Sequence, residues 1–365
     1  MNKPRVLMIG PGRDVMGGIS TVVNNYFHCG LDKKIELYYL PTMEDGSKLK
    51  KLIVAAKAYA KFGNLLKKYD IIHVHMAAQA SFDRKALFVK RAKAAGKKII
   101  IHQHAADFDK YFLEEVDYAK REGIKQIFSM ADKIIVLSEE WADFFGNYVC
   151  NKEKIEILHN GVITPEYEKT SYSDHNVLML GRLGQRKGTY DLLKAIPKVV
   201  AEIPDAMFYL GGDGDVEQCK KIASEQSLEN HITFLGWVRG EDKEEYLRKC
   251  STFVLPSYHE GMPMSVLEAM SYGLATISTN VGGIPQVIEQ GVSGIRIEAG
   301  DVDALLDALL SVLRDDGIKR KLGIAGRERI REKFDFTANV DALNWIYKRV
   351  NNESDGIIPD STQII

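Results

Sequence analysis

Short β-rich runs alternate with helical patterns along almost the whole chain, and the alternation restarts once. Six runs come first, a polar stretch without a clear pattern follows from Thr164 to His175, and six further runs come after it. Strands that alternate with helices are typical of parallel sheets with helices on both faces. The runs lie at 6–10, 35–40, 71–75, 98–102, 133–137 and 154–158, and then at 177–181, 207–211, 231–236, 252–256, 275–278 and 294–297. The sequence therefore predicts two doubly wound, Rossmann-like α/β domains that face each other across a cleft.

The length of the chain also favours two domains. With 365 residues, of which 45% are hydrophobic, the chain exceeds the size at which a single core keeps growing. We expect a first domain over residues 1–165, completed by a last helix at 336–350 that crosses back onto it. Residues 166–335 should form the second domain, and the composition of 351–365 is typical of a disordered tail.

Cysteine usage and hydropathy bear on where the protein works. The four cysteines are scattered and never form a CxxC pair, and the start MNKPRVLMIG lacks a long apolar segment. No apolar run approaches the roughly 20 residues that span a bilayer. We therefore expect a cytoplasmic protein with reduced thiols, for which a peripheral contact with the inner face of the cell membrane stays open.

A lysine-rich stretch without acids, SKLKKLIVAAKAYAKFGNLLKKY, runs over 47–69 in the more basic half of the chain. At about 100° per residue, its lysines and its apolar residues lie on opposite sides of a helix. Such a helix can rest on anionic lipid headgroups, or it can pack its apolar side on the sheet and leave its lysines in water. We favour the second interpretation. The apolar side consists of Leu52, Ile53, Ala56, Tyr59 and Ala60.

The first chemically informative segment is GRLGQRKG (181–188), which directly follows a predicted strand. Ligands of open α/β sheets lie beyond the carboxyl ends of the strands, so this turn is well placed. Arg182 offers a planar fork and Lys187 a point charge, and together they can neutralise the phosphoryl oxygens of a departing diphosphate. Taken alone, the pattern is equally typical of a surface turn with two solvated cations.

The second segment, SYHEGMPMSVLEAMSYGLA (257–275), carries the carboxylates Glu260 and Glu268. Pro263 fits the first helical turn, which places Glu260 in a loop and Glu268 on the helix. Glu260 can accept hydrogen bonds from sugar hydroxyls and Glu268 from a vicinal diol such as ribose, although either acid alone is also typical of an ordinary surface. Backbone N–H groups that would face an anion at the helix start belong to Gly261, Met262 and Met264.

The third segment, MGGISTVVNNYF (16–27), follows the first predicted strand. Gly17 and Gly18 allow the backbone to approach a ligand closely, with a helix start behind them. A nicotinamide-cofactor site would require GxGxxG and an acid at the end of the second strand. Here that strand ends in Leu40-Pro41, which weakens the cofactor interpretation.

In this order and spacing, the segments resemble the retaining GT-B glycosyltransferases of family four over nearly the whole chain. Two segments, IIHVHMAAQASFDRK (71–85) and HQHAADF (102–108), are further similar to the subset that builds bacterial surface polysaccharides. Ala105 and Gln286 depart from the family pattern and bear on the identity of the sugar. The matching pieces are the front glycine pair, His104 in HQHAADF, HNGV (159–162), GRLGQRKG, GGDGD (211–215), FLGWV (234–238), the Glu260 and Glu268 pair, and NVGGIPQVI (280–288).

The resemblance implies a retaining glycosyltransferase, a hexosyltransferase, that moves a sugar from a nucleotide-diphosphate sugar to a hydroxyl of a glycan or lipid-linked glycan. A UDP-sugar is favoured as donor, and neither a cofactor nor a metal is expected. The first domain would bind the acceptor and the second the donor. The implied contacts are Arg182 and Lys187 on the diphosphate, Glu260 on the donor sugar, Glu268 on the ribose, His104 near the reacting carbon, Gly17 and Gly18 on the donor phosphates or the acceptor, Val238 at the nucleobase, and Gly261, Met262, Pro263 and Met264 around the donor.

Two patterns suggest a metal. His73 and His75 alternate on one run, and His102 and His104 on the next, so each pair points to one face. Without an acidic ligand nearby, satisfied histidines at a sheet end are the better interpretation. Asp213-Gly214-Asp215 resembles the DxD of another glycosyltransferase architecture, but it lies in a turn, where Asp and Gly are ordinary.

The segment SFDRK (81–85) opens a predicted helix, with Ser81 as its N-cap. Arg84 and Lys85 oppose the helix dipole there, which suggests another purpose. They would contact the diphosphate of a polyprenyl-linked acceptor, or they are solvated surface charges.

Two other functions stay open, a sugar-nucleotide epimerase on the same fold and a non-catalytic nucleotide-sugar sensor. An epimerase would convert the donor without an acceptor, and a sensor would bind the donor without turnover. Nucleic-acid binding has little support, because the basic stretch offers few base-stacking aromatics.

Overall fold

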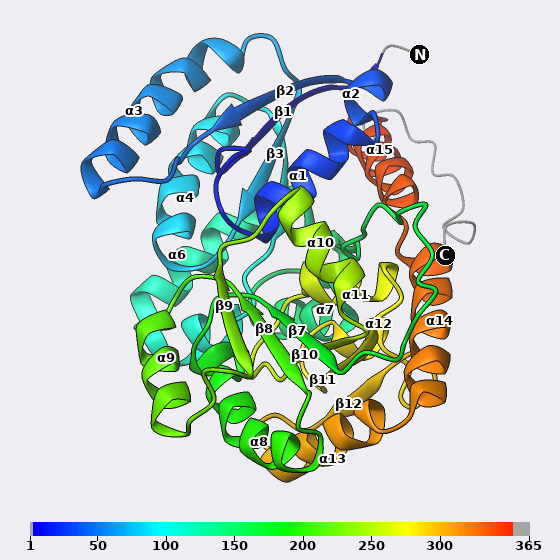
Figure 1. Ribbon diagram of the computed structural model, residues 1–365. Helices are drawn as coiled ribbons and strands as arrows, with labels where there is room; N and C mark the ends of the chain where they lie inside the picture. Colours follow the sequence, from blue (N-terminus) through cyan, green and yellow to red (C-terminus); the bar gives the residue numbers. More distant parts are fainter. Residues whose placement is uncertain (1–2, 353–365) are drawn as a thin grey trace. The chain divides into compact units, whose positions relative to one another are not determined.

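The computed structural model describes residues 3–352 and divides into two compact units (Figure 1). Unit 1 holds described residues 3–160 and 336–352, and unit 2 holds 161–335. Each unit contains one six-stranded parallel sheet, as the alternating pattern predicts. The predicted tail at 351–365 lies outside the described residues except for Asn351 and Asn352, which end the last helix.

Unit 1 is built on a parallel sheet with the strand order β2-β1-β3-β4-β5-β6. Its strands are β1 (Arg5–Gly10), β2 (Glu36–Pro41), β3 (Ile71–Met76), β4 (Lys98–Gln103), β5 (Lys133–Val136) and β6 (Ile155–Ile157). Its helices are α1 (Gly18–His28), α2 (Leu31–Lys34), α3 (Lys48–Leu65), α4 (Gln79–Ala94), α5 (Phe108–Lys110), the π-helix Tyr111–Glu115, α6 (Tyr118–Ser129), α7 (Glu139–Tyr148), the 3₁₀ turn Lys152–Lys154 and α15 (Phe336–Asn352).

The two faces of this sheet bury different chemistry. Successive residues of a strand point to opposite faces, so alternate positions of β3 and β4 separate cleanly. One face carries Val74 and Ile101 into a large apolar cluster with Phe62 of α3, Phe88 of α4 and Phe128 of α6. The opposite face presents the histidines of β3 toward the last helix, α15.

Unit 2 has the strand order β12-β11-β10-β7-β8-β9, again entirely parallel. Its strands are β7 (Asn176–Leu180), β8 (Met207–Gly211), β9 (Ile232–Gly236), β10 (Thr252–Leu255), β11 (Ala275–Thr279) and β12 (Ile295–Ile297). Its helices are the 3₁₀ turn Gln185–Lys187, α8 (Thr189–Glu202), α9 (Val216–Glu225), α10 (Glu241–Lys249), α11 (Met264–Ser271), α12 (Ile284–Val287), α13 (Val302–Leu313) and α14 (Asp316–Lys333).

Apolar spacing explains why these helices form where they do. In α8, Leu192, Leu193, Ile196 and Val199 recur at helical spacing and are fully buried. A 14-residue helix would be marginal in isolation, so burial of this face supplies most of its stability.

Helix α3 contradicts the interpretation favoured from its sequence. The expected apolar side was to pack on the sheet, yet the exposed fractions are 68% for Leu52 and 46% for Ile53. Leu49, one turn earlier, is 67% exposed. The buried residues of the helix, Ala58, Phe62 and Leu65, all lie in its second half. The first half of α3 therefore extends away from the body of unit 1 (Figure 1).

None of the helices within residues 3–352 combines the length and the apolar character needed to cross a bilayer.

Substitution of Gly188, the residue before α8, tests the packing of unit 2. Its φ of 68° is left-handed, and an added Cβ would lie 1.9 Å from the carbonyl oxygen of Pro256. Gly236 has nearly the same φ, 65°, but nothing lies within 4 Å of its Cβ position. We expect Gly236→Ala to cost about 1–2 kcal/mol from backbone strain and Gly188→Ala at least about 2 kcal/mol more from the clash. Urea unfolding measures both, and equal losses would contradict the predicted close approach.

Candidate functional site

Three loops of unit 2 meet where neighbouring strands end. Because β7, β10 and β11 are adjacent and parallel, the loops that follow them leave the same edge of the sheet. The backbone N–H of Tyr258 donates to the carbonyl of Arg186 at 2.8 Å, which joins the first two loops. The N–H of Gly283 donates to the carbonyl of Gly261 at 2.6 Å, which joins the second and third. Two of the segments predicted from sequence to bind a ligand, 181–188 and 257–275, thus form one connected structure with the loop after β11. The third predicted segment, 16–27, lies in unit 1.

The centre of this structure is an ion pair between Lys187 and Glu260. The Lys187 Nζ lies 2.5 Å from Glu260 Oε1, and the side chains are only 11% and 4% exposed. The hydroxyl of Ser257 donates to the same carboxylate oxygen at 2.6 Å. Both charged residues were predicted from sequence, but as separate contacts to a ligand rather than as partners. Ser257 was missed, although it stands only two residues after β10.

Glu268 lies on α11, as expected, and has a partner of its own. Lys243 of α10 donates to Glu268 Oε1 at 2.7 Å, and both side chains are mostly buried. Lys243 could not be singled out from the sequence, because it stands in an ordinary charged run, EDKEEY. The helix begins at Met264, and Pro263 is its N-cap, so the expectation of Pro263 inside the first turn is wrong by one position. Buried residues just before the helix are Gly261, Met262 and Pro263.

Arg182 shares the first loop with Lys187 but stays in solvent. Its side chain is 69% exposed, and its guanidinium lies 4.0 Å from the carboxylate of Asp213. The turn that carries Asp213 and Asp215 is held by backbone bonds to Leu183, at 2.7 and 3.0 Å. Asp215 also accepts a hydrogen bond from the Tyr190 hydroxyl at 2.8 Å. The turn of Asp213 and Asp215 therefore supports the loop that carries Arg182.

A second polar contact supports the same loops and was not found from sequence. The hydroxyl of Tyr258 donates to Asp191 Oδ2 at 2.6 Å, which ties the loop after β10 to α8. Its bond to Asp191 raises the pKa of Tyr258, with burial adding to the effect. Lys194 donates to the other oxygen of the same carboxylate, Oδ1 of Asp191, at 2.9 Å. The start of α8 is thereby fixed beside Lys187.

The remaining predicted donor contacts lie at other strand ends. Val238 follows β9, and its side chain is 3.1 Å from the Cβ position of Gly211 at the end of β8. Gly17 and Gly18 are exposed at the start of α1 in unit 1, with a φ of 139° at Gly17. They are therefore available to a ligand, but they belong to a different unit from Lys187 and Glu260.

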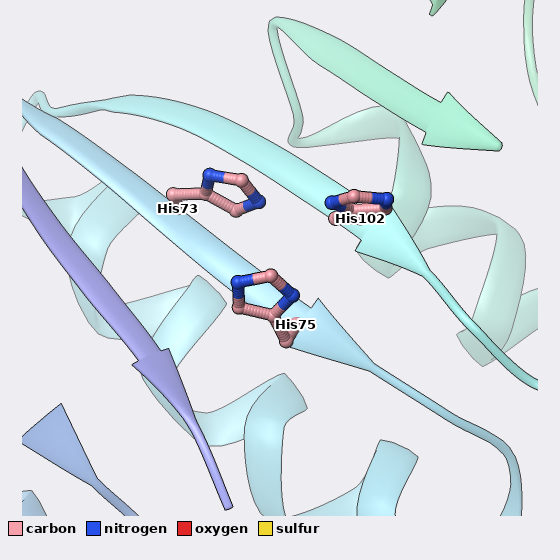
Figure 2. Close-up of side chains that lie close together, drawn as sticks. All are labelled: His73, His75 and His102. Carbon is pink, nitrogen blue, oxygen red and sulfur yellow. The ribbon is translucent and has the colours of Figure 1, made fainter. Parts of the chain in front are cut away.

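His104 follows β4 and belongs to a cluster of four histidines in unit 1. Its Nε2 lies 2.9 Å from Nδ1 of His75, and its ring is tilted by 31° against that of His102, with centroids 4.1 Å apart. Burial lowers the pKa of His104 to about 3, with the charges of His73 and Lys85 adding to the effect. A neutral imidazole is therefore the form present at neutral pH. Figure 2 shows His73, His75 and His102 together on the strands.

The predicted acceptor contacts need two corrections. Helix α4 begins at Gln79 with Ala78 as N-cap, so Ser81 does not cap it. Lys85 is 1% exposed and not a solvated charge; its ammonium contacts the Ser81 hydroxyl at 3.3 Å. Burial lowers the pKa of Lys85 to about 7, and the nearby charge of Arg84 adds to this. Burial likewise lowers the pKa of the half-buried Arg84.

Comparisons with known proteins agree with this architecture. The model for "Glycosyltransferase Family 4" matches residues 29–165, and that for "Glycosyl transferases group 1" matches 174–315. UDP-Gal:alpha-D-GlcNAc-diphosphoundecaprenol alpha-1,3-galactosyltransferase of Escherichia coli is 27% identical over 351 residues, which cover 87% of this chain and 84% of that protein. Amylovoran biosynthesis glycosyltransferase AmsK of Erwinia amylovora is 27% identical over 278 residues, 73% and 66% of the two chains. Sucrose-phosphate synthase of Thermosynechococcus elongatus shares the fold, with a TM-score of 0.81, 19% identity, and 96% and 100% of the chains covered.

The Lys187–Glu260 pair can be tested through stability. Breaking a buried pair leaves one charge uncompensated, so Lys187→Met and Glu260→Gln should each cost about 3–5 kcal/mol. The double variant should recover much of that loss, because it removes both charges. Urea unfolding provides the measurement.

The control is Lys220→Met, since Lys220 pairs with Glu217 on the surface. That variant should change stability by less than about 0.5 kcal/mol. Additive losses in the double variant would mean that Lys187 and Glu260 are not coupled.

Proposed function

This chain belongs to family 4 of the glycosyltransferases and transfers a sugar from a nucleotide sugar, and on that premise we propose a donor, an acceptor and a mechanism. The donor is a UDP-sugar carrying a hexose, and the configuration at the anomeric carbon is retained. The acceptor is a hydroxyl of a glycan or of a polyprenyl-diphosphate-linked glycan. The Escherichia coli relative, whose name gives UDP-Gal and a diphosphoundecaprenol-linked sugar, supports both choices.

The observation that carries the donor assignment is the buried contact between Lys187 and Glu260. The Lys187 ammonium has three protons, so it can keep Glu260 and also contact a phosphoryl oxygen. Glu260 retains acceptor capacity for a sugar hydroxyl while Ser257 and Lys187 bind its Oε1. A cation for the diphosphate and an anion for the sugar hydroxyls thus lie side by side. They match the two kinds of group, diphosphate and hydroxyl, that an activated sugar carries.

Arg182 and the first turn of α11 complete the proposed donor contacts. Arg182 is exposed and can swing its guanidinium onto the diphosphate, exchanging a weak contact with Asp213 for a bidentate one. The first N–H groups of α11, including that of Met264, have no intrahelical acceptor and favour an anion. Glu268 would accept the ribose hydroxyls, and the backbone around Val238 would contact the nucleobase.

The proposed chemistry is a front-face displacement. The acceptor oxygen bonds to the anomeric carbon on the side from which the diphosphate leaves, and the bond from that carbon to the diphosphate oxygen breaks. The proton of the acceptor hydroxyl passes to a phosphate oxygen of the donor. Arg182 and Lys187 then hold the added charge of the leaving nucleotide, a contact that strengthens as the reaction proceeds.

Unit 1 supplies the proposed acceptor side. The neutral His104 can exchange a hydrogen bond with the donor sugar, and the exposed Gly17 and Gly18 can approach phosphates or the acceptor closely. Arg84 is our candidate for the acceptor diphosphate, with Lys85 adding charge from beneath the surface.

Helix α3 is our candidate for contact with an anionic membrane. Its exposed apolar residues Leu49, Leu52 and Ile53 recur at i, i+3 and i+4, so they share one side of the helix. Lys48, Lys50, Lys51 and Lys57 surround them and are exposed as well. An amphipathic basic helix binds such a surface through apolar burial and attraction to anionic headgroups.

Arg182→Ala separates catalysis from folding. Because Arg182 is exposed, its loss should change the free energy of unfolding by less than about 0.5 kcal/mol. Loss of one donor to the developing charge should lower kcat about 100-fold. Sugar transfer from UDP-sugars identified by thermal shift, with and without acceptor, provides the measurement.

Arg331→Ala is the matched control, an exposed arginine that pairs with Glu328. It should leave transfer unchanged. Wild-type transfer by Arg182→Ala would remove Arg182 from the site, and conversion of the donor without any acceptor would favour an epimerase.

The membrane contact of α3 predicts a vesicle experiment. Leu52→Ser should weaken binding to phosphatidylglycerol vesicles roughly tenfold, because burying a leucine contributes about 1.5–3 kcal/mol. Leu87→Ser is the control, since Leu87 of α4 is 54% exposed in the same unit. Co-sedimentation measures both, and equal binding by wild type, Leu52→Ser and Leu87→Ser would remove α3 from the contact.

A further inference from the structure

A cluster of ring nitrogens lies buried in unit 1. His73 and His75 are two positions apart on β3, and His102 pairs with His75 in the register of β4. All three therefore point to the same face of the sheet (Figure 2). One ring nitrogen of each lies within 4.8 Å of the others, and none of the three residues is more than 1% exposed.

Most of these nitrogens have no partner. Nε2 of His73, Nε2 of His75 and both ring nitrogens of His102 are buried without a hydrogen-bond partner among residues 3–352. A buried polar group without a partner costs free energy, and such groups are rare in folded proteins. Four of them within one cluster indicate that something else satisfies them.

The bonds that do exist orient the rings. Nδ1 of His73 lies 2.5 Å from the hydroxyl of Tyr347 on α15, and Nδ1 of His75 lies 2.9 Å from Nε2 of His104. In metal sites, a ligating histidine typically uses one nitrogen for the ion and the other for an outer partner that fixes the ring. His73 and His75 follow this arrangement, with Nδ1 held and Nε2 left for an ion.

We propose that His73, His75 and His102 bind one transition-metal ion of the Zn²⁺ type. Imidazole nitrogens suit Zn²⁺, Co²⁺, Ni²⁺ and copper, and three histidines leave a coordination position for water. The ion would join β3 and β4 and, through Tyr347, would fix α15 against the sheet. Its role is structural: the ion takes no part in the proposed sugar transfer, although its ligand His75 contacts His104.

Burial disfavours the charged form of the three rings and lowers the pKa of each. The nearby cation is Lys85, whose charge adds to the lowering of the pKa of His75.

The rings must turn to receive the ion. Those of His73 and His75 are stacked, with centroids 4.6 Å apart and planes 19° apart. Bonds of about 2.0–2.1 Å to Zn²⁺ in a tetrahedral site place ligand nitrogens about 3.3 Å from each other. Rotation about the side-chain torsions would therefore bring the three nitrogens together and aim their lone pairs at one point.

Cobalt titration of the full-length chain tests the proposal. The protein is freed of any affinity tag, stripped with EDTA and titrated with Co²⁺, whose visible absorption reports nitrogen ligands in a low-coordinate site. We expect one equivalent to bind, Zn²⁺ to displace it, and Zn²⁺ to raise the unfolding temperature. Absence of one-to-one binding by the wild type would overturn the proposal, whatever the variants do.

Variants locate the ion. His102→Gln should abolish the one-to-one absorption, whereas His28→Gln, which changes an exposed histidine of the same unit, should leave it intact. Tyr347→Phe should weaken Co²⁺ binding about 10- to 100-fold, the usual effect of losing an outer partner. A one-to-one site that survives in folded His102→Gln, as judged by circular dichroism, would place the metal elsewhere and contradict the assignment.

Discussion

The parallel order of the sheet in unit 2 limits where its chemistry can lie. All six strands run in one direction, and β7, β10 and β11 are neighbours, so the loops that follow them leave one edge together. Close backbone contacts then lock these loops to each other, at Gly188 beside Pro256 and at Gly283 beside Gly261. The Lys187–Glu260 pair depends on this convergence, because its members are 73 positions apart in sequence.

In the sheet of unit 1, strand geometry separates two kinds of buried side chain. Alternation along β3 gives one face to apolar packing, through Val74 and Met76, and the other to imidazole rings, through His73 and His75. The last helix then covers the second face and bonds to it through Tyr347. A polar cluster is thereby buried beside, and not within, the main apolar core.

The strands, and the loop and helix positions of Glu260 and Glu268, could be predicted from sequence, because alternation and motif spacing are local signals. The twelve β-rich runs correspond to the twelve strands, and Glu260 and Glu268 lie in the loop and helix assigned to them. Pairings between distant segments could not be predicted. Nothing near Lys243 marks it as the partner of Glu268, and Ser257 looks like any turn serine until the fold brings it to Glu260.

The burial or exposure of individual side chains could not be predicted from sequence either. The pattern of α3 is the same whether its apolar side faces a sheet or solvent, and only the structure shows that Leu52 is exposed. The expectation for Lys85 was wrong in the opposite sense. A charged residue near a helix start is usually solvated, but Lys85 is buried. Periodicity indicates which residues share one side of a helix, but not whether that side faces protein or solvent.

The enclosed contact between Lys187 and Glu260 has a consequence for selectivity. The ammonium keeps protons for a phosphoryl oxygen beside its bond to Glu260, and the carboxylate keeps acceptor capacity beside its bonds to Lys187 and Ser257. On the proposed donor assignment, a phosphate alone would use only the first group and a free sugar only the second. A molecule that carries an anion and a polyol together would engage both groups at once, so the site would favour the intact donor over either fragment.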